Sequence, residues 1–235
     1  MSTLLICNVQ VVNEGLIQEA DVFIRDGRIA RIGSNLSHLQ SKQFIDGAGK
    51  YLMPGMIDSE FRLKDYSLSE LQQETKAALA GGITSSLLVP ELAPDLFKPS
   101  IADISLQNNL SIYYPATHQN HEGMESIDHS HCCGIYVDMV SLNDDHRIDD
   151  PKVIENILQS SPTLVTFNAE DAPSILENEE SYRQIYGDDV PFQLHSLIRG
   201  ADACTIAATE VLKVAVKLSS TAGCKHAGDT TGPEK

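Results

Sequence analysis

A glycine-rich turn, a short apolar run and a sudden polar cluster follow one another at residues 45–62, which read IDGAGKYLMPGMIDSEFR. Gly47 and Gly49 let the chain turn through positive φ. Met56-Ile57 is typical of a strand that enters a parallel sheet covered on both faces. Because the carboxyl ends of the strands carry the chemistry in barrels of alternating strands and helices, Asp58 opens the first candidate site.

Before this segment the sequence predicts a small β unit, which we place at residues 1–52. Residues 4–8 and 10–13 are expected to form two strands. Asp26-Gly27 is a strong hairpin signal between two further strands.

Beyond Asp58, helix and strand patterns alternate. Ser67 and Glu70 form a capping box that opens a helix, which Gly81-Gly82 ends. Further strands are expected at 83–89, 110–114, 134–139 and 163–167, and further helices from Pro151, over 172–180 and over 194–218. These elements make about five units of a β/α barrel at residues 53–218, short of a complete one. Residues 219–235 lack apolar periodicity and are expected to form a disordered tail.

Charge and cysteine content narrow the classes of function. The chain has 33 acidic and 17 basic residues, a net charge of −16, which argues against nucleic acid or an anionic membrane as a partner. Its five cysteines are odd in number and lack a framework spacing, as in a reducing cytosol. No stretch reaches the roughly 18 apolar residues of a membrane helix. We expect a soluble, cytoplasmic protein.

The segment 46–58 resembles the start of the barrel in the cyclic amidohydrolases, most closely the dihydroorotases, which have an Asp-Ala-Gly-Lys turn and then Pro-Gly-Met-Ile-Asp. Residues 80–84 resemble that family's junction into the second barrel strand, and 195–204 its His-x-x-Ile-Arg-x-x-Glu-Ala-Cys segment. The resemblance covers about residues 4 to 218. It implies an α/β fold, namely an incomplete (β/α) TIM-type barrel of the metal-dependent hydrolase kind with a small N-terminal β-sandwich-like unit. Compared with the family, the chain would be degenerate and truncated at its C-terminal side. The retained frame residues are Asp58, Glu170, Asp171, His195 and Arg199.

The resemblance also implies where a metal would be held. In the family, zinc polarises the cyclic amide of dihydroorotate and lowers the pKa of the attacking water. At three ligand positions the family has a histidine, a lysine and a histidine, and this sequence has Arg62, Tyr136 and Asn168 there, respectively. At a fourth position, Glu91 replaces an asparagine that contacts substrate in the family. The sixth and eighth strands, which supply further ligands, have no counterpart in the sequence.

The expected protein is therefore a dihydroorotase-like member of the pyrimidine biosynthesis family that has lost metal binding and catalysis, with no catalytic residues and no cofactor. It would serve as an inactive homologue or a structural partner. Since an open half-barrel exposes a strand edge, we expect that edge to be covered by a second copy or by a protein partner such as aspartate carbamoyltransferase.

Two interpretations apply to His195 and Arg199, which lie four residues apart. As structural residues they would pair with acidic neighbours and fix the long helix to the barrel. As functional residues they would include an anion-binding arginine, which usually needs a fork of partners. We favour the structural interpretation.

An alternative function is a divergent zinc-dependent cyclic amidohydrolase that uses other ligands. These would come from His118, His121, His129, His131, Cys132 and Cys133. Their spacing suits zinc or another transition metal, although it lacks a Cys-x-x-Cys pair. The simpler interpretation is a solvated loop between the third and fourth strands.

Overall fold

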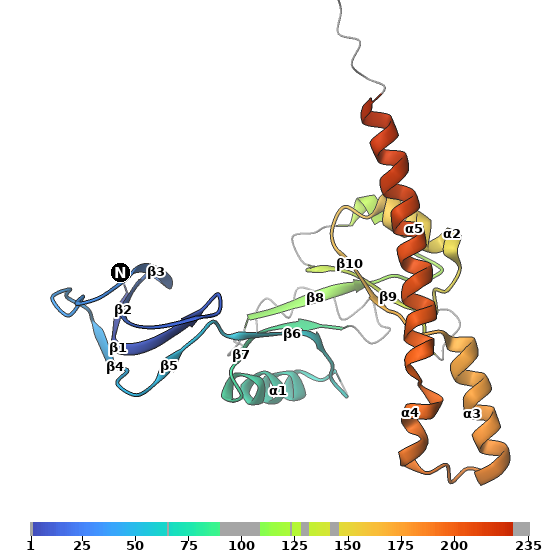
Figure 1. Ribbon diagram of the computed structural model, residues 1–235, viewed down its shortest axis with the longest axis horizontal. Coiled ribbons are helices and arrows are strands. Elements are labelled where there is room, and N and C mark those ends of the chain that lie inside the picture. Colours follow the sequence, from blue (N-terminus) through green and yellow to red (C-terminus); the bar gives the residue numbers. More distant parts are fainter. Residues whose placement is uncertain are drawn as a thin grey trace, which may run out of the picture. The chain divides into compact units, whose positions relative to one another are not determined.

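A computed structural model of the chain describes residues 2–64, 66–89, 109–122, 124–127, 132–141 and 146–227. It divides into two compact units, Met1–Met56 and Ile57–Lys235. The first is a β sheet and the second combines a parallel sheet with helices (Figure 1). Within the described ranges, no helix has the length and apolar character needed to cross a membrane.

The sheet of the first unit is built around one long strand. Strand β1 (Thr3–Asn13) pairs antiparallel with β2 (Leu16–Arg25), which pairs antiparallel with β3 (Arg28–Gly33). Strands β4 (Gln43–Asp46) and β5 (Tyr51–Leu52) pair parallel with successive parts of β1. Strand β1 therefore pairs with three of the other strands, and β3 joins the sheet through β2.

The two strands expected at 4–8 and 10–13 form the single strand β1. Its register shifts between Ile6 and Val9, where Asn8 has a φ of 56°. Such a bulge absorbs an extra residue without ending the strand, so the chain bends there and the pairing continues. Asp26 and Gly27, with φ of 49° and 75°, form the predicted hairpin turn.

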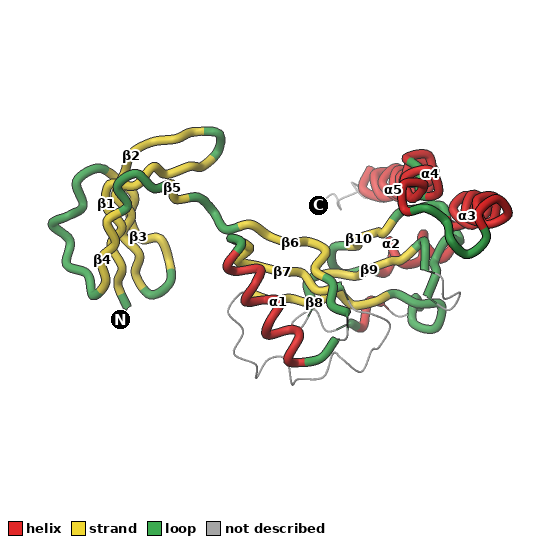
Figure 2. Tube along the Cα trace, turned by 90° about the horizontal axis from the view of Figure 1, so that it is seen from below, coloured by secondary structure: helices red, strands yellow, loops and turns green. Residues whose placement is uncertain are grey.

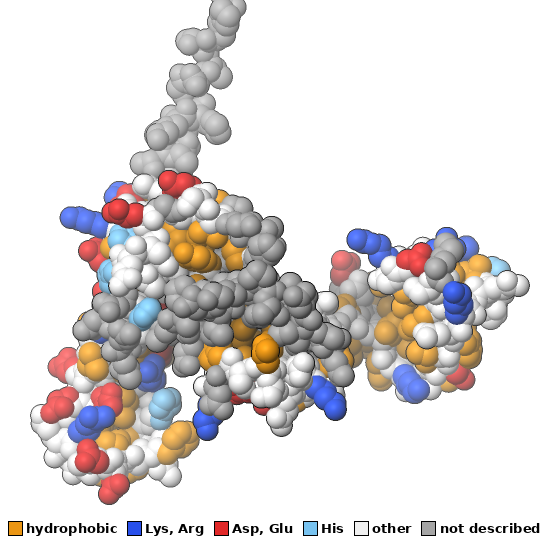
Figure 3. Space-filling view, turned by 180° about the vertical axis from the view of Figure 1, so that it is seen from behind, with side chains coloured by type: hydrophobic (Ala, Val, Ile, Leu, Met, Phe, Trp, Pro, Cys, Tyr) orange, Lys and Arg blue, Asp and Glu red, His pale blue; other side chains and the backbone are white. Residues whose placement is uncertain are grey.

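Both faces of this sheet carry apolar side chains. Val9 and Val22 are buried on one face, and Leu5 and Phe23 on the other. Apolar side chains also gather on the surface of this unit (Figure 3). Ile29 of β3, for example, is 64% exposed.

In the described part of the second unit, five strands lie side by side in chain order, β10-β9-β8-β7-β6 (Figure 2). Their bounds are Met56–Phe61 for β6, Ile83–Leu88 for β7, Asn109–Pro115 for β8, Gly134–Asp138 for β9 and Val165–Asn168 for β10. The pairs β7–β8, β8–β9 and β9–β10 are parallel. A sheet whose parallel strands follow the order of the chain is the arrangement of a β/α barrel, and the predicted fold class is confirmed.

Local capping chemistry starts the helices. The Ser67 side chain accepts a hydrogen bond from the backbone of Glu70 at the start of α1 (Leu68–Ala80). Asp150 caps α2 (Pro151–Ser160), and Asp171 caps α3 (Ala172–Tyr186). Each cap satisfies a backbone N–H group that has no partner inside its helix.

The helix expected over 194–218 is not continuous. A short 3-10 turn (Phe192–Leu194) leads into α4 (His195–Ile198), and α5 (Ala201–Ala227) begins after Gly200. Arg199 has a ψ of 67°, outside the helical range, and glycine costs about 1 kcal/mol in a helix interior. These two residues end α4.

The disordered tail expected from residue 219 does not begin there, because α5 is helical as far as Ala227. Extending an existing helix needs no new nucleus, and each added residue gains a backbone hydrogen bond. Residues 228–235 lie outside the described ranges.

The main core of the second unit lies between β9 and helices α2 and α5. Ile154 and Ile157 of α2 have no exposed surface, and neither do Ile135 and Val137 of β9, in the same cluster. Val214 of α5 completes this cluster. The core fixes β9, whose carboxyl end contributes to the candidate site.

Candidate functional site

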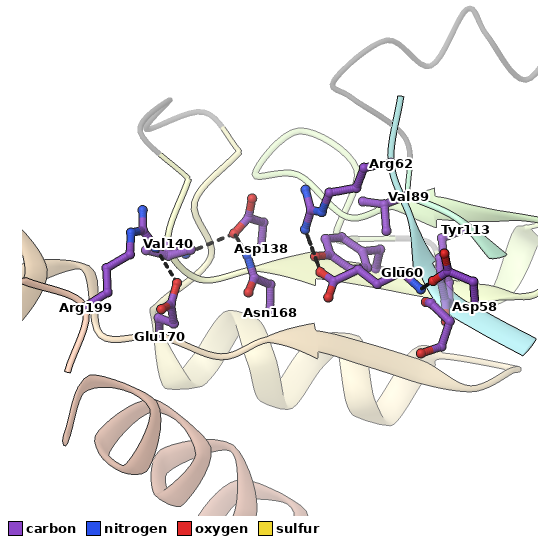
Figure 4. Close-up of polar contacts among 12 residues, drawn as sticks. Asp58, Glu60, Arg62, Val89, Tyr113, Asp138, Val140, Asn168, Glu170 and Arg199 are labelled. Carbon is purple, nitrogen blue, oxygen red and sulfur yellow. Dashed lines mark hydrogen bonds and ion pairs between the residues drawn. The ribbon is translucent and has the colours of Figure 1, made fainter. Parts of the chain in front are cut away.

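The residues at the three family metal positions come from β6, β9 and β10, and Figure 4 labels two of them, Arg62 and Asn168. Arg62 directly follows β6, Tyr136 lies in β9, and Asn168 ends β10. Parallel neighbouring strands end at the same edge of a sheet, which explains how residues so far apart in the sequence meet.

Arg62, Glu60 and Tyr136 form a closed hydrogen-bonded network. The Arg62 Nη2 atom donates to Glu60 Oε1 at 2.6 Å and to the Tyr136 hydroxyl at 2.7 Å. The Tyr136 hydroxyl donates to Glu60 Oε1 at 3.0 Å. The Arg62 guanidinium carbon also lies 5.8 Å from the centroid of the Tyr136 ring. This network joins the end of β6 to β9.

The network fixes the charge state of its members. The hydrogen bond from Arg62 holds the pKa of Glu60 below its usual value. Burial raises the pKa of Tyr136 well above its usual value, so its hydroxyl stays neutral and can donate to Glu60. The network therefore contains one positive and one negative charge, which offset each other.

Replacing Arg62 with glutamine should flatten the pH dependence of stability in acid. Because Arg62 lowers the pKa of Glu60 in the folded protein, the ionised carboxylate stabilises the fold above its ordinary pKa of 4.5. That contribution is lost as the pH falls through the lower folded value. Both side chains are about half exposed, so the effect should stay below about 1 kcal/mol. Urea denaturation at about pH 5 and pH 3 measures it.

Arg62→Lys is the control for this experiment. It keeps the positive charge beside Glu60 and should keep most of the pH dependence of the unchanged protein. If the free energy of unfolding changed with pH equally in Arg62→Gln and in the unchanged protein, that result would contradict the assigned ion pair.

A second set of polar contacts lies next to the network. Asn168 Nδ2 donates to Asp138 Oδ1 at 3.2 Å, and the backbone N–H of Val140 donates to the same oxygen at 3.1 Å. Asp58 accepts a hydrogen bond from the backbone of Glu60 at 3.0 Å. These carboxylates hold local backbone and side chains in place.

Two of the residues at the family metal positions, Arg62 and Tyr136, do not suit a divalent cation. Proteins bind zinc through thiolate, imidazole and carboxylate groups, whereas Arg62 is cationic and Tyr136 is a neutral phenol with a raised pKa. Within the described ranges, no group of three or more His, Cys, Asp and Glu residues is arranged to hold a metal ion.

Glu170 and Arg199 form an ion pair between the end of β10 and α4. Arg199 Nη1 lies 2.5 Å from Glu170 Oε2, and the side chains are 32% and 19% exposed, respectively. Asp171 accepts a hydrogen bond from the backbone of Ser174. His195 stacks on Phe192, with ring centroids 5.9 Å apart. The retained frame residues after β10 thus hold α3 and α4.

The alternative zinc cluster is only partly described. The Nε2 atom of His118 is 2.7 Å from the carbonyl oxygen of Arg147, and the Nδ1 atom of His121 is 2.9 Å from the carbonyl oxygen of His118. Burial raises the pKa of the Cys133 thiol, which disfavours the thiolate that binds metal. His129, His131 and Glu91 lie outside the described residues. The zinc cluster stays a prediction.

Glu60 was absent from the predicted site, although the sequence holds a signal for it. Glu60 and Arg62 are two residues apart at the end of a strand, so their side chains point to the same face. An opposite-charge pair in that spacing predicts an ion pair at the strand end.

No family model matches the chain, but curated proteins are similar to parts of it. The L-hydantoinase of Paenarthrobacter aurescens is 30% identical over 98 residues, 40% of this chain and 21% of that protein. The dihydroorotase of Trichlorobacter lovleyi is 34% identical over 93 residues, 38% of this chain and 22% of that protein. Protein unc-33 of Caenorhabditis elegans is 39% identical over 82 residues, 35% of this chain and 10% of that protein.

Solved structures match most of the chain. The L-hydantoinase from Arthrobacter aurescens matches with a TM-score of 0.80 and 20% identity, over 92% of this chain and 51% of that one. This chain has the hydantoinase fold. The dihydropyrimidinase from Brevibacillus agri matches with a TM-score of 0.73 and 21% identity, over 91% of this chain and 50% of that one. The predicted resemblance to cyclic amidohydrolases is confirmed, and the chain spans about half the length of these solved hydantoinase-fold structures.

Proposed function

We propose that this chain is a non-catalytic relative of the dihydroorotases and hydantoinases. The observation that carries the proposal is the position of Arg62, whose guanidinium donates to both Glu60 and Tyr136 at the strand ends. A fixed positive charge at this place opposes the binding of a divalent cation, and the one nearby carboxylate of the network is already neutralised by it.

The donor chemistry supports the same proposal. Metal-assisted amide hydrolysis needs an ion that polarises the carbonyl and generates hydroxide near neutral pH. Neither a guanidinium nor a neutral phenol ligates such an ion. In this proposal the network has a structural role, because it ties β6 to β9 and replaces the attraction that a shared metal ion would give. A partner that covers the sheet edge, such as a second copy or aspartate carbamoyltransferase, stays a prediction.

The test is the metal content and the activity of the full chain purified without chelator. We expect less than about 0.1 zinc per chain by elemental analysis, since zinc held by several protein ligands binds tightly enough to be retained. We also expect no hydrolysis of dihydroorotate or hydantoin. Added zinc should bind more tightly to Arg62→Gln than to the unchanged protein if the guanidinium repels the ion.

Stoichiometric zinc together with hydrolysis of either cyclic amide would overturn the proposal. If zinc were found, two double variants would locate it, His118→Ala with His121→Ala and His129→Ala with His131→Ala. Loss of zinc in either double variant would support the alternative cluster, and zinc retained in both would point back to the strand ends.

A further inference from the structure

The hairpin of β2 and β3 in the first unit carries three arginines on one face. Arg25 lies directly opposite Arg28, and Phe23 lies directly opposite Arg31. Opposite residues of paired strands share a face of the sheet, and so do Phe23 and Arg25, which are two residues apart in β2. All three arginines are exposed. They therefore lie together on one side of the hairpin, next to Phe23.

A bulge in β3 brings two of these arginines to the same face. Residues three apart in a regular strand point to opposite faces, and Arg28 and Arg31 have this spacing. The pairing of β2 with β3 shifts its register between Phe23 and Ile24, so that it passes over Ala30. One extra residue in a strand reverses the alternation of faces beyond it. The bulge therefore completes the cluster of three.

The arginines of this cluster are not neutralised by a carboxylate. Within the part of the chain that the structure describes, none of the ion pairs involves them. The nearby carboxylate of Asp26 accepts a hydrogen bond from the backbone of Ser2. Asp21, on the same strand, accepts from the backbone N–H groups of Asn8 and Leu36. Both carboxylates thus hold backbone groups in place.

The hairpin is a cationic site on an acidic protein. Residues 22–33 include three arginines and one aspartate, a formal charge of +2, whereas the whole chain has a net charge of −16. Like charges directly opposite each other in a sheet are destabilising, and Arg25 and Arg28 are such a pair. The guanidinium carbon of Arg25 lies 5.5 Å from the centroid of the Phe23 ring, which orients this side chain. A bound anion would offset the repulsion.

We propose that Arg25, Arg28 and Arg31 bind a phosphoryl group that carries two negative charges. Guanidinium groups match the oxygens of a phosphate with paired N–H donors. The Cβ atoms of opposite residues in a sheet are about 5 Å apart and those of diagonal neighbours about 7 Å, so three arginine side chains can reach one tetrahedral anion. A long polyanion such as nucleic acid would be repelled by the net charge of the chain.

NMR titration of the isotope-labelled full chain with inorganic phosphate tests the proposal. The titration is run at a constant ionic strength of about 0.15 M, and at about pH 7.5, where a phosphoryl group carries close to two charges. We expect the side-chain N–H signals of the three arginines to shift and to saturate with a Kd of about 10 mM or below, the range for a ligand of this size. Acetate, which has one charge, should bind at least about threefold more weakly.

The phosphoryl group has two sources, the free ion and a phosphorylated side chain. O-phosphoserine is the probe that separates them. Tighter binding than that of inorganic phosphate assigns the site to phosphorylated side chains, and equal or weaker binding assigns it to the free ion.

Arg28→Gln should weaken phosphate binding by about threefold to tenfold, because it removes a charged hydrogen-bond donor at an exposed position. Lys50→Gln is the matched control, since it removes one positive charge from the same unit. The carbonyl oxygen of Lys50 accepts from the backbone of Gln10, whereas Arg25 pairs with Thr3. These two places on β1 are about 23 Å apart along the strand, so the control should change the Kd by less than about 1.5-fold.

A double variant moves one arginine without changing the charge of the chain. Arg31→Ile together with Ile32→Arg keeps the composition and places the third guanidinium on the opposite face of β3. It should weaken phosphate binding as much as Arg31→Gln does. Ile32 is 47% exposed, so an arginine there reaches water, and circular dichroism checks that the sheet is retained.

Four results would overturn the assignment. The first is no saturable shift of the arginine signals up to about 50 mM phosphate, five times the expected limit. The second is equal effects of Arg28→Gln and Lys50→Gln, and the third is unchanged binding in the double variant. The fourth is tighter binding of a short single-stranded DNA than of phosphate. The site lies in the first unit and the experiment reads binding, so its failure leaves the proposal of lost catalysis untouched.

Discussion

Replacing Ile154 with alanine is expected to lower the free energy of unfolding of the second unit by about 2 to 5 kcal/mol. Ile154 is fully buried and belongs to the cluster that joins α2 to β9 and α5. The substitution removes buried apolar surface and leaves a cavity, because the surrounding side chains relax only partly. Urea denaturation followed by circular dichroism measures the loss.

Ile185→Ala is the matched control for this prediction. It is the same substitution in a helix, but Ile185 of α3 is 70% exposed. Its expected effect is within about 0.5 kcal/mol. Equal losses for the two variants would contradict the packing of α2 against the sheet.

Replacing Glu170 with glutamine is expected to cost about 2 kcal/mol, within the range for hydrogen bonds to charged groups. The substitution leaves the guanidinium of Arg199, which is 32% exposed, without its charged partner. The link between the end of β10 and α4 is weakened as a result.

Glu179→Gln is the comparison variant for Glu170→Gln, because it breaks an ion pair of the same kind at a more exposed position. It breaks the ion pair with Arg183, whose side chain is 56% exposed, so it should cost less than about 0.5 kcal/mol. If Glu179→Gln lowered the free energy of unfolding as much as Glu170→Gln, the exposure of these ion pairs would not determine what they contribute to stability. Denaturation of both variants at one pH makes the comparison.

Local chemistry made much of the fold predictable. Asp26-Gly27 favours positive φ at both positions and forms the hairpin that the dipeptide predicts. Ser67 and Asp150 cap their helices because each side chain accepts from a backbone N–H group within three residues. These signals depend only on residues that are close together in the sequence, so they can be recognised from the sequence alone.

Contacts between distant residues were not predictable in the same way. The pairing of Arg62 with Tyr136 joins residues 74 positions apart. One helix was expected over residues 194–218, but α4 ends at Arg199, where this side chain pairs with Glu170. Contacts between residues far apart in the sequence determine these features, and the periodicity of apolar residues does not reveal such contacts.

The order in which β1 finds its partners has a consequence for synthesis. The hairpin with β2 forms within about 10 μs once both strands are available, whereas β4 and β5 lie at residues 43–52. At about 5 to 20 residues per second, the ribosome needs roughly 1 to 5 seconds to add residues 26–52. During that time the edge of β1 that does not pair with β2 lacks its partners, β4 and β5. The bulge at Asn8 bends this edge, and a bent edge is a poor template for a strand of another nascent chain.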